Sequence, residues 1–497
     1  MFDKIREIIN RILNLNKTLD NYKKEAVVEA LPSLAYVNRA KKCIDRGEFD
    51  KAKKILEEAM ELPQEDALVY KYLGIVCDKT GRLAEAITAF KKSANINDAD
   101  KEIWRFLGFA LMNSNKCEEA IESFENANKI NPANTDVFAG WGMALMKLKR
   151  YNEAHEKFME SVRLNRYNFM ALLLAAIMEV RTGQYNEAEA KLNFLANVNP
   201  NETNTYEYAN LKYIKKDYDS AIHYAKKALE FNPNMLPVYL LLGKLYAIKG
   251  DKKASLTAYE TAKERKLESP HLYFDWAITM QMYENYEQAK LYFLKALSFA
   301  PGEEEANAGL ALTEACLGNI DEAELLIKNL KSLNDENYLY AKATAVIAMY
   351  RNDFNTAITK LKNIQDKMFF DNTINLFIAV CYDELKDINN AKEYYENALL
   401  SAGDNLKVYL KYADFLIKHN DYESAQRKLN RALKLNENNI DVLNKLFHVG
   451  YILVKEKDSE YNMKETLAIA DKIISIDNEA FLYPEEREDL ENILKNR

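Results

Sequence analysis

Large apolar, small and turn-forming residues recur along this chain in an order that predicts pairs of antiparallel helices. The pattern is clearest in residues 101–135, where Trp104 and Gly108 share one face of a first helix, and Ala120 and Phe124 share one face of a second. Because Gly108 and Ala120 carry almost no side chain, we expect the two helices to approach closely. Trp104 and Phe124 should then fill the space around the contact.

Polar and helix-breaking residues mark the connection and the end of this unit. Asn113 to Lys116 supply a polar turn, and Pro132 ends the second predicted helix. A pair of helices this short cannot bury its own apolar face. It needs similar units on both sides, which favours a repeat protein.

One small residue early in each second predicted helix recurs every 34 residues, with a single interval of 33. The twelve positions are Ala52, Ala86, Ala120, Ala154, Ala188, Ala221, Ser255, Ala289, Ala323, Ala357, Ala391 and Ala425. The residue twelve positions earlier is Gly or Ala in every unit. Four positions later, eleven of the twelve units carry a large apolar or aromatic residue, and Ala225 is the exception.

These large and small positions resemble the tetratricopeptide repeat, a helix–turn–helix unit of 34 residues. The resemblance covers residues 33–439 in twelve units and implies an all-α fold, a right-handed α-solenoid of stacked helix pairs. Leu195, Leu330 and Ile364 replace the second small residue of their second helices. We therefore expect local helix packing to differ in those three units.

The two ends of the chain depart from the repeat. Residues 1–32 place Phe2, Ile5 and Ile9 at helical spacing with charges between them, which predicts an amphipathic helical segment. This segment either caps the first repeat or contacts a partner or a membrane surface, and its interrupted apolar run argues against a signal peptide. Residues 440–497 predict a degenerate thirteenth helix pair and a capping helix over residues 484–495.

Composition narrows the functional classes. A net charge of −8 argues against a nucleic-acid-binding surface, and no run of 18 apolar residues predicts a transmembrane segment. An odd number of widely scattered cysteines does not resemble a disulfide scaffold, so we expect reduced thiols and a cytoplasmic protein. The five cysteines are Cys43, Cys77, Cys117, Cys316 and Cys381.

The sequence contains no convincing constellation for catalysis or cofactor binding. The five histidines fall in different units without an HExxH motif, and neither GxxxxGK[ST] nor GxGxxG occurs. Runs of carboxylates fit solvated helix faces better than a desolvated acid and base. We therefore predict a non-enzymatic protein with no catalytic, cofactor-binding or metal-binding residues.

The sequence favours a protein-binding surface over a catalytic site. The resemblance implies that the first helices line the concave side of the solenoid and that five positions of each face the groove. In this chain those positions include an apolar set, the first-helix stripe. Its members are Phe109, Met112, Met143, Met146, Leu173, Ile177, Tyr206, Tyr213, Phe274, Ile278 and Met282. Methionine and aromatic residues suit a surface that repacks around a ligand, although burial between neighbouring helices would also explain them.

Two specialised binding modes of the family do not transfer to this sequence. A clamp for a C-terminal carboxylate needs lysine and asparagine on successive turns, but Lys342 is followed by Val346 at the asparagine position. An asparagine ladder for a peptide backbone would need an amide in each unit, and Asn38 alone matches.

We therefore predict a protein-interaction scaffold that binds peptide or helical segments of a partner in its concave groove. One alternative is a recognition subunit of a multi-subunit enzyme such as a transferase. A second alternative is an RNA-binding helical repeat, which would need basic grooves and base-stacking platforms. The identity of the partner cannot be read from the sequence.

Overall fold

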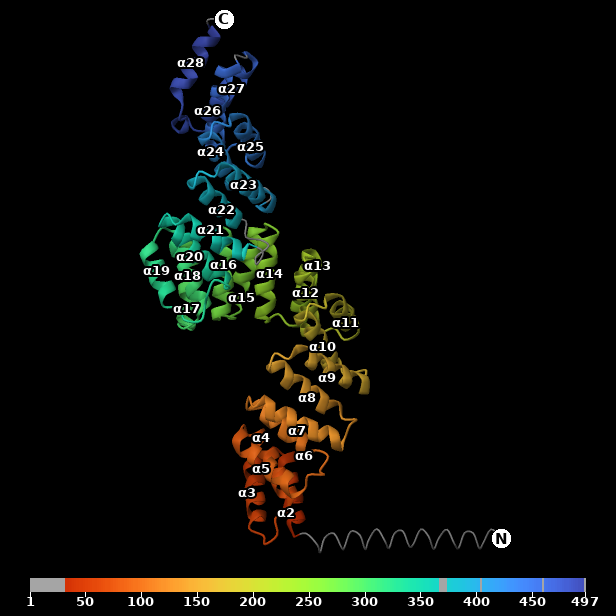
Figure 1. The fold of residues 1–497 in the computed structure, drawn as a ribbon. Coiled ribbons are helices and arrows are strands. Elements are labelled where there is room, and N and C mark those ends of the chain that lie inside the picture. Colours follow the sequence, from red (N-terminus) through yellow and green to blue (C-terminus); the bar gives the residue numbers. More distant parts are fainter. Residues whose placement is uncertain (1–31, 366–372, 403–404, 458–459, 496–497) are drawn as a thin grey trace, which may run out of the picture. The chain divides into compact units, whose positions relative to one another are not determined.

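A computed structural model of the chain describes residues 32–365, 373–402, 405–457 and 460–495. This part of the chain is entirely helical, with 27 α-helices and no strand. The predicted amphipathic segment lies outside the described residues, apart from Pro32. The chain divides into two compact units, Met1–Pro233 and Asn234–Arg497, each an array of paired helices (Figure 1).

In the first unit, six helix pairs follow one another. Each second helix packs against its own first helix, and the first five second helices also pack against the first helix of the next pair. The first helices are α2 (Ser33–Asp45), α4 (Ala67–Lys79), α6 (Ile103–Asn113), α8 (Thr135–Lys147), α10 (Phe169–Arg181) and α12 (Glu202–Ile214). The second helices are α3 (Phe49–Met60), α5 (Leu83–Ile96), α7 (Cys117–Ile130), α9 (Tyr151–Leu164), α11 (Tyr185–Val198) and α13 (Tyr218–Phe231).

The second unit repeats this arrangement in six further pairs. Its first helices are α14 (Leu236–Ile248), α16 (Pro270–Met282), α18 (Glu304–Cys316), α20 (Tyr338–Tyr350), α22 (Thr373–Glu384) and α24 (Leu406–Lys418). Its second helices are α15 (Lys252–Glu264), α17 (Tyr286–Phe299), α19 (Ile320–Lys328), α21 (Phe354–Ile364), α23 (Ile388–Ala402) and α25 (Tyr422–Leu435).

The pairing depends on a contact between a small residue of each first helix and a large residue of the second. A Cβ atom added at Gly108 would lie 2.7 Å from the ring of Phe124, and one added at Gly74 would lie 2.4 Å from Phe90. Both rings are fully buried. The space beside these glycines is therefore filled by a ring from the partner helix, and a larger residue would have no room.

Trp104 occupies a different place from the one expected. It is partly buried at the edge of the same core, and its Nε1 donates a hydrogen bond of 2.8 Å to the carbonyl of Asp98. The three atoms nearest to a Cβ added at Gly108 all belong to the Phe124 ring. An indole N–H needs a polar partner, which explains why Trp104 stays at the edge.

The turn between the two helices of each pair contains a residue with positive φ. These residues are Gly47, Gly81, Asn115, Lys149, Gly183, Lys216, Gly250, Glu284, Gly318, Asn352, Lys386 and Asn420. In the turn after α6, the amide of Lys116 donates to the carbonyl of Leu111 at 2.9 Å, which satisfies a carbonyl at the helix end. The left-handed residue thus reverses the chain at the same point of every pair.

One of the three irregular units is visibly altered. The helix α19 has nine residues and ends at Lys328, before Leu330. The amides of Lys331 and Ser332 then donate to the carboxylate of Glu304 at 3.0 and 2.9 Å. A side chain of the preceding first helix therefore accepts the hydrogen bonds that a longer α19 would have made within itself.

After α25 the chain forms a longer pair, α26 (Ile440–Lys457) and α27 (Glu460–Ile476), then a 3-10 turn η1 (Asn478–Ala480) and the helix α28 (Pro484–Lys495). The helix α26 continues to Lys457, and α27 begins at Glu460. Leu490 of α28 is fully buried, and Tyr451 donates a hydrogen bond of 2.8 Å to Asp489. The last helix is therefore docked by both apolar and polar contacts.

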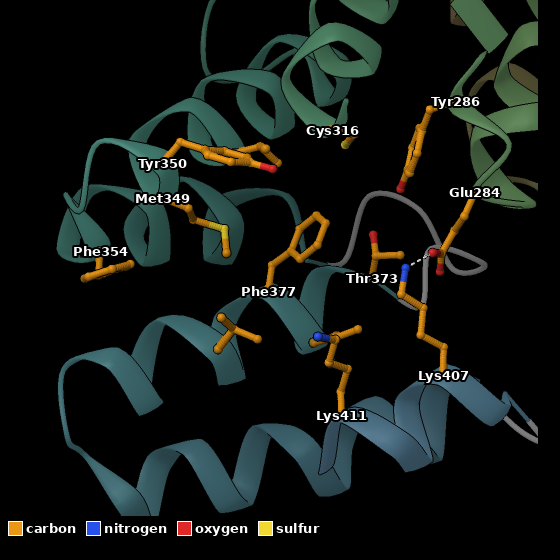
Figure 2. A pocket seen from close by; sticks show the side chains of 13 residues that line it. Glu284, Tyr286, Cys316, Met349, Tyr350, Phe354, Thr373, Phe377, Lys407 and Lys411 are labelled. Atoms are coloured by element: carbon orange, nitrogen blue, oxygen red, sulfur yellow. Dashed lines mark hydrogen bonds and ion pairs between the residues drawn. The ribbon is translucent and has the colours of Figure 1, made fainter. Parts of the chain in front are cut away.

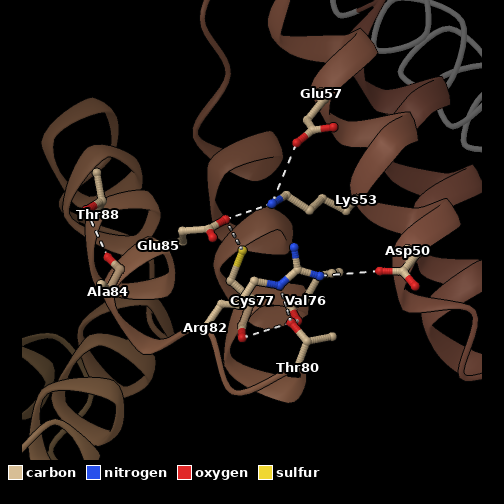
Figure 3. A network of polar contacts seen from close by, with 10 residues as sticks. All are labelled: Asp50, Lys53, Glu57, Val76, Cys77, Thr80, Arg82, Ala84, Glu85 and Thr88. Atoms are coloured by element: carbon tan, nitrogen blue, oxygen red, sulfur yellow. Dashed lines mark hydrogen bonds and ion pairs between the residues drawn. The ribbon is translucent and has the colours of Figure 1, made fainter.

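The described chain contains no disulfide, and Cys77, Cys117 and Cys381 are buried whereas Cys43 and Cys316 are partly exposed. Cys77 lies in a polar network between the first two pairs (Figure 3), where its Sγ donates to the carboxylate of Glu85 at 3.7 Å. Burial raises the pKa of Cys77, and it raises the pKa of Cys381 to about 12. A thiol that stays protonated is a poor nucleophile.

Replacing Gly108 by Leu should destabilise the protein, because the added side chain must displace the Phe124 ring. Overpacking of this kind typically costs ~1–3 kcal/mol. Thermal or urea unfolding of the full chain measures the loss. Gly302→Leu is the matched control, since a Cβ there meets no atom within 4 Å. Equal unfolding of the two variants would contradict the close contact.

Cys77, Cys117 and Cys381 should react slowly with a thiol reagent in the native protein, because they are buried. Cys43 and Cys316 should react sooner. Mass spectrometry of timed alkylation reads each site, and denaturant should make the five rates similar. Fast native labelling of Cys381 at pH 8 would disagree with its burial and raised pKa.

Candidate functional site

A cavity of about 410 Å³ lies within the second unit, where α20, α22 and α24 face the turn between α16 and α17 (Figure 2). We call it the lysine pocket. Its polar lining includes Glu284, Tyr286, Thr373, Lys407 and Lys411. Its apolar lining includes Val346, Met349, Phe354, Leu376, Phe377 and Val380.

The apolar wall of the lysine pocket comes from two neighbouring first helices. Val346 and Met349 are three positions apart on α20, and Phe377 and Val380 are three apart on α22, so each pair shares a helix face. Figure 2 shows the Phe377 ring projecting into the space beside Met349. Phe377 also packs against buried clusters on both sides. The wall is therefore held in place before any ligand binds.

The charged side of the lysine pocket comes from α24 and the turn after α16. Lys407 and Lys411 are one helical turn apart, and both side chains extend toward the cavity (Figure 2). Lys407 forms an ion pair with Glu284, which lies 123 positions earlier in the chain. This pair joins α24 to a turn more than three repeats away, so the pocket depends on the curvature of the second unit.

A third lysine lies behind the apolar wall. Lys342 is 9% exposed, and its Nζ lies 5.8 Å from the ring centroids of both Tyr338 and Phe377. Desolvation by burial lowers the pKa of Lys342 to about 8, against the smaller opposing effects of Cys316 and Glu284. This amine therefore titrates close to neutral pH.

Comparisons with known proteins identify the repeat. A family profile described as "Psidin, N-terminal TPR repeats region" matches residues 37–171, and tetratricopeptide repeat profiles match residues 206–235, 236–268 and 373–446. The chain belongs to the tetratricopeptide repeat (TPR) family. A TPR repeat-containing protein of Methanocaldococcus jannaschii is 25% identical over 273 residues, which are 50% of this chain and 47% of that protein. The match thus spans about half the length of this curated relative.

Solved structures share the fold of this TPR protein. A chain in the crystal structure of the APC/C hetero-tetramer Cut9-Hcn1 aligns with a TM-score of 0.57 at 15% identity, covering 95% of this chain and 97% of that one. A tetratricopeptide repeat protein from Parabacteroides merdae aligns with a TM-score of 0.37 at 19% identity, covering 56% and 98%. The first alignment shows the shared helical-repeat fold.

Eight residues of the first-helix stripe lie in the first unit of the TPR array. Met112 and Leu173 are buried, with 7% and 4% of their surfaces exposed, so they offer little to a ligand. Phe109 makes an edge-to-face contact with the buried Phe124, the ring centroids lying 5.2 Å apart. The other members in this unit are partly buried, namely Met143, Met146, Ile177, Tyr206 and Tyr213.

The remaining three stripe residues lie in the second unit. Phe274 makes an edge-to-face contact of 5.9 Å with the buried Phe293. Phe274 and Ile278 both pack against the core formed by α18 and α20, and Met282 is partly buried. A peptide groove built on the stripe stays a prediction, and each unit carries its own part of it.

The lysine pocket lies beyond the predicted first-helix stripe, which ends in the eighth repeat. Val346, Met349 and Tyr350 occupy the ninth, twelfth and thirteenth positions of α20, which are among the groove positions of the TPR family. Thr373 and Val380 occupy the second and ninth positions of the eleventh repeat. The groove positions of the TPR family therefore include several residues that line the lysine pocket.

Two further findings concern other kinds of site. Within the ranges that the structure describes, no group of three His, Cys, Asp or Glu side chains is placed to hold a metal ion. No helix among the same residues is long and apolar enough to cross a membrane. Three of the histidines make hydrogen bonds to carboxylates inside the array: His155 to Glu179, His419 to Asp383 and His448 to Glu486.

Replacing Lys342 by Met should stabilise the protein at pH 7. The folded pKa is about 8 and the ordinary value 10.5, so between these pH values the unfolded state binds more protons and the free energy of unfolding of the parent rises with pH. The free energy of unfolding of the variant should be up to about 3 kcal/mol higher than that of the parent at pH 7. It should not rise with pH between 8 and 10.5 as that of the parent does. Urea unfolding from pH 7 to 10.5 tests it, with the exposed Lys411→Met as control. Parallel curves for parent and Lys342→Met would refute the shift.

Proposed function

We propose that this TPR protein is a non-enzymatic scaffold that binds peptide or helical segments of partner proteins on the first-helix faces of its repeats. Membership of the TPR family supports a role in protein interaction in general. The observation that carries the finer proposal is the lysine pocket, which places an apolar wall opposite charged side chains. Such a cavity suits a segment with both apolar and charged residues.

A second binding surface is proposed on the first-helix stripe of the first unit. Met143 and Met146 of α8 are partly buried and pack against the edge of the core, as does Ile177 of α10. Flexible methionine side chains can repack around different ligands. This surface would act in addition to the lysine pocket, with one binding face in each compact unit.

We also propose that the protein works in the cytoplasm with its cysteines reduced. The buried positions of Cys77, Cys117 and Cys381 support this view, because each fills a place in the helix core without a disulfide partner. The alternative that this protein is a recognition subunit of an enzyme predicts that a catalytic chain copurifies with it. A binding partner without catalytic activity would argue against that alternative.

Replacing Met349 and Tyr350 together by Ala should reduce partner binding, because both side chains line the lysine pocket. Truncating an anchor at the centre of an interface costs ~2 kcal/mol or more, which is about 30-fold in affinity. The partner is first identified by affinity capture of the tagged full chain and mass spectrometry. Its affinity is then measured against parent and variant by calorimetry.

Leu291→Ala with Leu294→Ala is the matched control, since both leucines are exposed on the second helix α17. A second double variant, Met143→Ala with Tyr206→Ala, tests the stripe. Thermal unfolding of each variant separates lost binding from lost folding. A partner that binds both double variants as tightly as the parent would place its site elsewhere on the chain.

A further inference from the structure

The lysine pocket contains an ion pair with which a charged ligand would compete. Glu284 lines the pocket and contacts the Nζ of Lys407, as Figure 2 shows. About half of the Lys407 side chain and about a quarter of the Glu284 side chain remain exposed. The pair is therefore open to solvent, and an incoming carboxylate can compete for the lysine.

One helical turn along α24, Lys411 lines the same pocket and is exposed. Among the described residues it forms no ion pair, whereas other lysines of this region do. Lys418, on the same helix, lies 2.9 Å from Asp383, and Asp383 also accepts a hydrogen bond from His419. The carboxylate of Asp383 is thus already bound by these two residues. Among its described lining residues, the pocket has two lysines and one carboxylate, and this excess of positive charge favours an anionic ligand.

The position of Glu284 in the fold gives an independent indication. It is the left-handed residue of the turn between α16 and α17, with φ of 53°. The eleven equivalent turn residues are five Gly, three Asn and three Lys, so Glu284 is the single acid in the series. Gly and Asn are favoured there because they adopt the left-handed conformation at low cost, and Glu has no such advantage. Its contact with Lys407 accounts for an acid at this place.

We propose that Glu284 is a built-in competitor for the ligand of the lysine pocket. The ligand is a partner segment with an Asp or Glu side chain next to a large apolar residue. Its carboxylate replaces Glu284 on Lys407 and reaches Lys411, while the apolar side chain packs between Met349 and Phe377. This inference rests on the proposed function. It adds the chemical class of the partner segment, and it adds that the ion pair of Glu284 with Lys407 weakens the binding of that segment.

The charge on the ligand is placed on a side chain, because the described lining of the pocket has two lysines and no asparagine, and the carboxylate clamp of the TPR family needs both residue types. An acidic side chain within a longer segment needs only the lysines. The apolar wall then binds the adjacent residue.

Two fluorescein-labelled peptides with amidated C-termini test the proposal on the full chain. The first alternates Phe and Leu with Asp and Glu, and the second carries Asn and Gln in place of the acids. Fluorescence anisotropy should show that the parent binds the acidic peptide more tightly and that added salt weakens this binding. Lys411→Met should reduce the affinity for the acidic peptide about tenfold, as expected for one lost hydrogen bond between charged groups.

Glu284→Gln is the decisive variant. Removing the competing charge should raise the affinity for the acidic peptide about two- to fivefold, the range of an exposed ion pair, and leave the neutral peptide unchanged. Glu287→Gln and Lys434→Met are matched controls, since both residues are exposed and lie outside the pocket. Thermal unfolding confirms that each variant is folded.

The outcomes separate this inference from the proposed function. Unchanged or weaker binding of the acidic peptide by Glu284→Gln would overturn the role of Glu284 as a competitor. Equal binding of the acidic and neutral peptides, lost in the Met349 and Tyr350 double variant, would overturn the acidic ligand and leave peptide binding in the pocket intact. Binding of neither peptide by the parent would count against both.

Discussion

The structure depends on one packing contact. In all but one of the twelve repeats the second helix carries a large side chain, which packs against a position of the first helix that has almost no side chain. Phe124 shows how far this contact reaches. Its ring fills the space beside Gly108 of its own pair and also the space beside Gly140 of the next pair, where an added Cβ would lie 2.6 Å from the ring. One ring therefore joins two repeats, and neither repeat can be completed without its neighbour.

The same requirement explains why the fold could be predicted from the sequence. A close helix contact needs Gly or Ala at fixed places, and a buried ring needs Phe or Tyr, so the packing leaves a residue pattern that recurs. Tyr259 and Gly243 repeat the relation, and Ser255 fits because its hydroxyl donates to the carbonyl of Gly243 at 2.8 Å. The turn conformation was less predictable, since Lys149 adopts the same left-handed backbone as Gly183.

The candidate site was predictable only in part. The groove positions of Met349 and Val380 follow from counting along each first helix, because helix geometry fixes which positions share a face. The contact of Glu284 with Lys407 does not follow from any local pattern. It arises when several helix pairs, each slightly rotated on the last, bring α24 back toward the turn after α16. Small rotations summed over several repeats are invisible in the residues of any single one.

That contact gives the second unit a mechanical property. Cross-helix hydrogen bonds such as those from Lys53 to Glu85 and from Gln281 to Thr313 join positions about one repeat apart, so the array bends by small changes at each junction. The ion pair between Glu284 and Lys407 instead joins two positions more than three repeats apart. Because ions screen exposed charges over about 10 Å at 0.1 M salt, we expect added salt to weaken this ion pair and make this part of the solenoid easier to bend.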